Sequence, residues 1–329
     1  MVTSSTPAAL LDFQASAFRT QLSCVFDGNA DAVHAARVAT RRIRELLRVF
    51  QASAEGGRDD GDIADAFAQI GRALGRARDV DVRIALVNAL ETHMPQAAPS
   101  LVLIRHHFEG VRLKRMRQLI KTLERVEVNE LIRAVADTHR AARARLTSGR
   151  WRAQVRALVF ERACTALERL SHATGVYFPN RTHSARIAIK KLRYTAEILE
   201  ATSGGQLHPS IKILSKAQKI LGDLHDRQEL ADWLARHDHQ DGVDADHITI
   251  TRQVLTADVH EMHKQYLAQR DSVREAAVDV QRVAASATGY GPALALATAV
   301  AVAGAVWTRR ALSDGDVTSR LRPVARASA

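Results

Sequence analysis

Residues 34–44 read HAARVATRRIR and residues 183–193 read HSARIAIKKLR, so one pattern returns after 149 positions. A shorter pattern follows each copy, LGRARD at 74–79 and LGDLHD at 221–226, with a separation of 147 positions. Two motifs in the same order at nearly the same separation indicate an internal duplication. We therefore expect two related halves, residues 7–148 and 150–286, that meet near Ser148 to Arg150.

Both motifs lie in long stretches where apolar residues recur at helical spacing, from Pro7 to Ser286. Clusters of turn-forming residues interrupt these stretches, which gives roughly eight or nine helices and no strand. The predicted breaks are Asp27–Asn29, Glu55–Arg58, Pro95–Pro99, Thr147–Gly149, Pro179–Asn180, Ser203–Gly205 and Asp241–Gly242. Short connections between long helices favour antiparallel packing. The sequence thus predicts an all-α fold of two pseudo-symmetric antiparallel helical bundles.

The composition limits the function classes. The chain has 329 residues, 46% of them hydrophobic, and a net charge of +11 with neutral histidines. The positive charge favours a polyanionic partner. Aromatic residues make up only 5%, which argues against a base-stacking platform, and two cysteines exclude a disulfide scaffold. Because no secretory signal is visible at the start, we expect a cytoplasmic protein.

The last segment, residues 287–329, differs from the rest. Residues 283–308 carry no charge, and 292–307 are rich in alanine and valine, so their length alone would allow a membrane span. Alanine, glycine and proline make insertion marginal. We expect an alanine-rich helix that packs against protein rather than a membrane, followed by a basic, disordered extension.

The first motif places its cations on one face of a helix. At 100° per residue they fall within an arc of about 80°. These residues are His34, Arg37, Arg41, Arg44 and Arg48, with Arg42 on the flank. The second motif gives the same arrangement with His183, Arg186, Lys190 and Arg193, with Tyr194 at the edge and Lys191 on the flank. The opposite faces are apolar and suited to a core.

A solvated surface is the simplest explanation of such a face, but solvated faces usually mix charges of both signs. Like charges at i, i+4 destabilise a helix by about 0.2–0.5 kcal/mol per pair. That two helices tolerate this cost indicates an anion site, and a cation at every turn suits a chain of phosphates. Each histidine follows an expected helix cap, Asp31 or Thr182, whose free N–H groups would add to the attraction. We also expect binding to strengthen as the pH falls through the mid-sixes.

Further cations and two carboxylates extend the candidate site. One later helix carries Arg112, Lys114, Arg115, Arg117 and Lys121, and another carries Lys212, Lys216 and Lys219 at i, i+4, i+7. Asp79 and Asp226 end the shorter motifs, where they could hold neighbouring guanidinium groups in place or form ordinary surface ion pairs. Gly75 and Gly222 lie inside helices, which suggests close helix packing.

These motifs resemble those of the conserved-histidine α-helical domain (CHAD) family, over roughly Pro7 to Ser286. The resemblance implies two pseudo-symmetric bundles whose basic helices line a central groove or pore. It also implies binding of inorganic polyphosphate and targeting to polyphosphate granules, without catalysis. The residues that match the family motif are His34, Arg37, Arg41, Arg42, Arg44, His183, Arg186, Lys190, Lys191 and Arg193. Arg48, Arg112 and Arg115 are added from helical geometry.

Other functions have less support in the sequence. His260 and His263 share a helix face, but spacing places no third metal ligand, so we expect no metal and no cofactor. A phosphate-transferring enzyme would need clustered carboxylates for a divalent metal, which Asp79 and Asp226 alone do not supply. A nucleic-acid or nucleoid-associated binder remains the alternative, because positive charge does not distinguish polyanions. The sequence identifies no protein partner.

Overall fold

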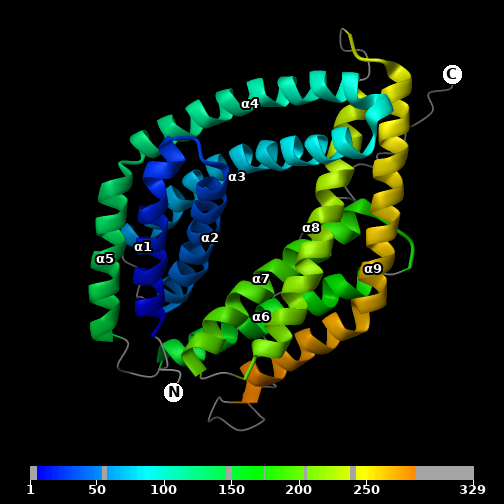
Figure 1. Ribbon diagram of the computed structural model, residues 1–329. Helices are drawn as coiled ribbons and strands as arrows, with labels where there is room; N and C mark the ends of the chain where they lie inside the picture. The colour runs from blue at the N-terminus through cyan, green and yellow to red at the C-terminus, as the bar shows by residue number, and fades with distance from the viewer. Residues whose placement is uncertain are drawn as a thin grey trace, which may run out of the picture. The chain divides into compact units, whose positions relative to one another are not determined.

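The computed structural model describes residues 6–53, 58–145, 150–173, 175–203, 206–237 and 242–286. Within these ranges the chain forms nine α-helices and one short 3-10 helix, with no strand (Figure 1), so the all-α prediction is confirmed. The first half holds α1 (Pro7–Phe26), α2 (Ala30–Ser53), α3 (Arg58–His93), η1 (Pro95–Ala97), α4 (Ala98–Arg125) and α5 (Val128–Arg145). The second half holds α6 (Arg150–His172), α7 (Pro179–Ser203), α8 (His208–Arg236) and α9 (Ala245–Ser286).

Several helices that follow each other in sequence pack side by side, as short connections favour. In the first half α2 packs against α1 and α3, and α3 packs along α4 after the η1 turn (Figure 1). In the second half α7 packs against α6 and α8. The repeated motifs therefore occupy α2 and α7, and the shorter motifs occupy α3 and α8. The origin of the repeat by duplication stays an interpretation of the sequence.

The halves share their cores. One apolar cluster contains buried residues from both halves, including Phe18, Phe67, Ile43, Leu192 and Tyr266. A second cluster joins the later part of α3 and the early part of α4 to α8 and α9. Within it, Phe108 of α4 lies 4.6 Å from Trp233 of α8, measured between ring centroids. Because burial of apolar area across the halves stabilises the fold, the two basic helices are held against each other.

One helix break was not predicted. The chain turns between α4 and α5 at Glu127, which has a φ of 48° although it is not glycine. Its carbonyl oxygen accepts hydrogen bonds from the backbone N–H groups of Glu130 and Leu131, which start α5. No glycine or proline stands at this turn, so the usual signal for a break is missing.

The two predicted helix caps are wrong. α2 begins at Ala30 because the Asn29 side chain accepts a hydrogen bond from the N–H of Ala32, at 2.9 Å. α7 begins at Pro179, so Thr182 lies inside the helix, where its hydroxyl donates to the Phe178 carbonyl. His34 and His183 consequently lie one turn inside their helices, away from the free N–H groups.

The described residues up to Ala284 form one compact unit. The expected alanine-rich helix and extension of residues 287–329 lie outside the described residues, as does the chain at 146–149 where the halves would meet. The predicted domain limits, 7–286, therefore stay a prediction. Among the helices that the structure describes, none has the length and apolar character of a membrane span.

Candidate functional site

The basic helices α2 and α7 each bury the face opposite their cations. Ala36, Ile43 and Leu47 of α2 are fully buried, and so are Ala185 and Leu192 of α7. Their cationic faces are only half-buried, apart from the exposed histidines His34 and His183. Helical periodicity therefore gave the correct faces, because burial of one stripe fixes the rotation of each helix.

The two cationic faces meet where α2 packs against α7. Arg41 of α2 donates a hydrogen bond from Nη1 to the hydroxyl of Tyr194 on α7, at 2.9 Å. The guanidinium of Arg41 lies 5.5 Å from the centre of the Tyr194 ring, and that of Arg193 lies 4.3 Å from it. Tyr194 is buried, so it joins the two rows and does not offer its ring to a ligand.

We call Arg37 and Arg41 of α2 and Arg186 and Lys190 of α7 the four-cation cluster. Burial and the positive charges of Arg41, Arg186 and Arg37 together lower the pKa of Lys190 to about 7. Burial and then Arg41 lower the pKa of Arg37, with Arg186 also contributing. The cations of the two halves thus repel one another across the contact, and an anion placed among them would relieve this repulsion.

Carboxylates on α3 and α8 lie beside this cluster. Asp79 of α3 forms an ion pair with Arg37, with 3.6 Å between Oδ1 and Nη2. Burial raises the pKa of Asp226 on α8, Arg186 opposes this, and Asp223, Glu229 and Asp79 reinforce it, so that the resulting pKa is about 6. Each shorter motif therefore sets its aspartate near the arginine of its own half, where it offsets part of the positive charge.

The exposed histidines differ from the prediction in their titration. Partial burial and the nearby charges of Arg78, Arg37 and Arg41 lower the pKa of His34. Partial burial, Arg186 and Lys190 likewise lower the pKa of His183, whose ring lies 4.6 Å from that of His225. In the free protein both rings gain charge only below the mid-sixes, so the expected pH response of the histidines lies at more acidic values.

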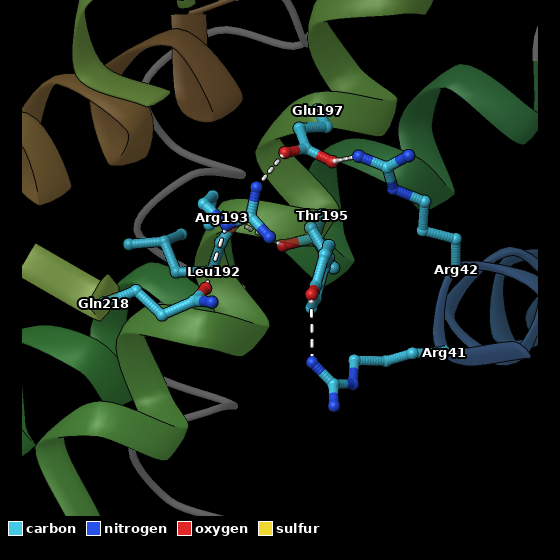
Figure 2. A network of polar contacts seen from close by, with 8 residues as sticks. Arg41, Arg42, Leu192, Arg193, Thr195, Glu197 and Gln218 are labelled. Carbon is cyan, nitrogen blue, oxygen red and sulfur yellow. Dashed lines mark hydrogen bonds and ion pairs between the residues drawn. The ribbon is translucent and has the colours of Figure 1, made fainter. Parts of the chain in front are cut away.

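Glu197 of α7 links the two halves (Figure 2). Its Oε2 accepts from Nη2 of Arg42 on α2 at 3.0 Å, and its Oε1 accepts from Nη1 of Arg193 at 2.5 Å. Nε of Arg193 donates to Oε1 of Gln218 on α8 at 2.9 Å. Arg42 and Arg193 therefore already have internal acceptors, and we assign them a positioning role within the predicted set.

Replacing Glu197 with glutamine should lower the free energy of unfolding by about 1–2 kcal/mol, since the partly exposed guanidinium groups of Arg42 and Arg193 would lose a shared charged acceptor. Urea unfolding measures this change. Glu168→Gln on α6, an exposed glutamate, is the matched control and should stay within about 0.5 kcal/mol of the wild type. Equal stability of both variants would contradict a linking role for Glu197.

The remaining predicted residues on the basic helices lie further along the row. Nη1 of Arg48 donates to both oxygens of the buried Glu45, at 2.7 and 2.9 Å. Burial lowers the pKa of the half-buried Lys191, and the nearby charges of Arg162 and Arg48 lower it as well. Burial lowers the pKa of Arg44, and the charge of Arg48 adds to this.

The cations predicted on other helices have other partners. Nε of Arg112 on α4 donates to Asp81 of α3 at 2.6 Å, and its Nη2 donates to the carbonyl of Gly28. Arg112 thus ties α4 to α3 and to the turn before α2, and Arg115 donates to Gln118 on its own helix. On α8, Lys212 and Lys216 are exposed and Lys219 pairs with Asp223 at 3.3 Å. These interactions do not connect the α4 and α8 cations to the four-cation cluster.

Close helix packing does not explain both helical glycines. A Cβ at Gly222 would meet nothing within 4 Å, and one at Gly75 would meet the Arg37 guanidinium at 3.6 Å, an ordinary contact. Sequence reasoning also missed Arg78 and His225, which lie near His34 and His183. They occupy equivalent positions 147 residues apart, so a full comparison of the repeats could have found them. In the part of the chain described, no group of three or more His, Cys, Asp or Glu residues is arranged for a metal.

Comparisons with known proteins agree with this architecture. The model of the CHAD domain family matches residues 9–235, so the chain belongs to the CHAD family. Two uncharacterised proteins of Mycobacterium tuberculosis, from strains CDC 1551 / Oshkosh and ATCC 25618 / H37Rv, are each 30% identical to it over 206 residues. The match covers 60% of this chain and 38% of each relative, so the chain spans well under half of their length.

Two solved structures share the fold. The crystal structure of the CHAD domain from the plant Ricinus communis has a TM-score of 0.62 at 19% identity, covering 84% of this chain and 95% of that one. PptA from Streptomyces chartreusis has a TM-score of 0.53 at 18% identity, covering 83% of this chain and 100% of its own. At these identities the likeness concerns the fold alone.

Proposed function

We propose that this protein binds inorganic polyphosphate at the four-cation cluster, without catalysing a reaction, and that binding brings it to polyphosphate granules in the cytoplasm. The observation that carries the proposal is the convergence of Arg37 and Arg41 of α2 with Arg186 and Lys190 of α7. Guanidinium groups match the geometry of phosphate oxygens, and an ammonium supplies a compact charge.

The charges of the four-cation cluster favour an anion that the protein itself does not supply. Burial and mutual repulsion lower the pKa of Lys190 to about 7, and among the described residues the guanidinium of Arg37 pairs with Asp79 at 3.6 Å. A ligand that brings several negative charges would restore the charged form of Lys190 and replace the weak pair. We expect a polymer because many modest contacts to one chain add up through counterion release.

Membership of the CHAD family supports the same ligand, since the resemblance of the motifs implies polyphosphate binding. The central groove or pore that the resemblance also implies stays a prediction. Nucleic acid is the competing ligand because it presents the same repeating phosphates. It would draw further affinity from stacking on exposed aromatic rings, and Tyr194 beside the cluster is buried.

A competition titration separates these ligands. Labelled long-chain polyphosphate is bound to the full chain at several salt concentrations, and then displaced by unlabelled polyphosphate, DNA, RNA or sulfate at matched charge. We expect DNA and RNA to require at least about tenfold more charge than polyphosphate, and affinity to fall steeply with salt. Equal displacement by DNA would identify a nucleic-acid binder, and release of orthophosphate during the titration would contradict binding without catalysis.

A further inference from the structure

The contact between α2 and α7 is not symmetric in charge. The 149-residue offset pairs Arg42 with Lys191, Arg44 with Arg193, and Arg48 with Glu197. On one side of the contact, Glu197 accepts from both Arg42 and Arg193, and Gln218 accepts from Arg193 as well. The protein itself therefore supplies hydrogen-bond acceptors for the cations on that side.

On the equivalent side of the contact, the position that corresponds to Glu197 holds a cation. Arg48 occupies that position, so Lys191 and Arg44 face a third positive charge, which the nearby Glu45 carboxylate offsets only in part. The buried Glu45 accepts from Arg48, at 2.7 and 2.9 Å, and serves that arginine alone among the hydrogen bonds described. Arg162 lies on α6, which packs against both α2 and α7, the helices of Arg48 and Lys191. Burial and then the charges of Arg162 and Arg48 lower the pKa of Lys191, an effect that Glu45 and Glu161 oppose.

Arg162 of α6 adds a further cation at this place. Only 15% of its side chain is exposed, and its ion pair with the neighbouring Glu161 is long, at 3.7 Å. Its Nε is buried and has no hydrogen-bond partner in the part of the chain described. A buried donor without an acceptor is costly, so the position favours a ligand that supplies one.

We propose that Arg48, Lys191 and Arg162 form a second phosphate subsite, which binds a phosphoryl group of the same polyanion that occupies the four-cation cluster. The inference rests on the proposed function and extends it to α6, which the repeated motifs do not reach. Arg44 lies between the two places on α2. The charges here are Arg44, Arg48, Lys191 and Arg162 against Glu45 and Glu161, an excess of two cations.

The geometry makes the subsite selective for chain length. Arg37 and Arg48 are 11 residues apart on one helix, about 16 Å at 1.5 Å per residue. A tripolyphosphate is too short to reach from one end of this row to the other, whereas a long chain can contact both places at once. Contacts made by one long chain add through effective concentration, so the second subsite should strengthen long chains selectively.

The test compares Arg162→Gln with the wild type, using tripolyphosphate and long-chain polyphosphate as probes in calorimetric titrations. We expect the variant to bind long chains about 3- to 10-fold more weakly, with a salt slope reduced by about one, and to bind tripolyphosphate within twofold of the wild type. Arg169→Gln, at an exposed arginine of the same helix, removes the same charge and should change neither affinity by more than twofold.

Two further variants test whether a lower affinity reflects loss of the subsite or unfolding. Arg162→Lys keeps the charge and should retain most of the long-chain affinity. Arg48→Gln removes the charge but keeps an amide donor for the buried Glu45, so it should fold and bind long chains more weakly. If Arg162→Gln binds long chains as tightly as Arg169→Gln does, the second subsite does not exist. The same follows if Arg162→Gln weakens the binding of tripolyphosphate as much as the binding of long chains. If the wild type binds neither probe, the proposed function itself fails.

Discussion

Replacing both Arg37 and Arg186 with glutamine is expected to weaken binding of long-chain polyphosphate by about 100-fold or more. One arginine comes from each half, and each would lose a charge-assisted contact worth about 1.5–3 kcal/mol. Glutamine keeps much of the aliphatic stem and does not place a new carboxylate beside Asp79 and Asp226. The salt slope should also fall by about one to two. Fluorescence anisotropy with a labelled chain measures both quantities.

The control for this double variant removes two exposed arginines that lie outside the basic rows. Arg169→Gln with Arg274→Gln produces the same change in net charge. It should bind within about threefold of the wild type, because distant solvated charges are screened. Both double variants should retain the wild-type helix content and melting temperature to within a few degrees. Equal affinities of the two double variants would mean that net charge, and not the four-cation cluster, attracts the polymer.

The second large effect is on pH dependence. Burial and the charges of Arg41, Arg186 and Arg37 lower the pKa of Lys190 to about 7, so in the free protein this lysine is mostly neutral above pH 7. Bound phosphate favours the ammonium form, so binding takes up a proton. Each pH unit above 7 then costs about 1.4 kcal/mol. Affinity for long chains should therefore fall by up to about 100-fold between pH 7 and pH 9, while the internal phosphates keep their charge.

Lys190→Arg is the matched variant for this prediction, because a guanidinium stays charged throughout this range. The variant should lose most of the dependence between pH 7 and 9, and at pH 9 it should bind more tightly than the wild type. Protonation of Asp226, whose pKa burial raises to about 6, would strengthen binding only at lower pH and so does not confuse the comparison. If the affinity of Lys190→Arg depends on pH as steeply as that of the wild type, another group takes up the proton.

The fold and the cationic faces could be predicted from the sequence because they depend on local periodicity. The apolar stripes of α2 and α7 fix which way Arg37 and Arg186 point, and those stripes are visible in the sequence alone. The return of the motif after 149 positions also indicated that two such helices belong together.

The parts that could not be predicted depend on contacts between distant residues. Glu197 accepts from Arg42 across 155 positions, and nothing in the neighbouring sequence distinguishes it from a solvated glutamate. Arg112 lies in a basic run that suggested ligand binding, but Asp81 and the Gly28 carbonyl hold it. The break at Glu127 carries no glycine or proline, and the helix after it, α5, packs along α1, which is distant in sequence.

A crystal structure of the full chain with long-chain polyphosphate would test the account most directly. We expect phosphoryl groups between α2 and α7, with oxygens within hydrogen-bonding distance of both Arg37 and Arg186. Polyphosphate bound instead to the exposed lysines of α8, or to one basic helix without the other, would contradict the joint action of the two rows.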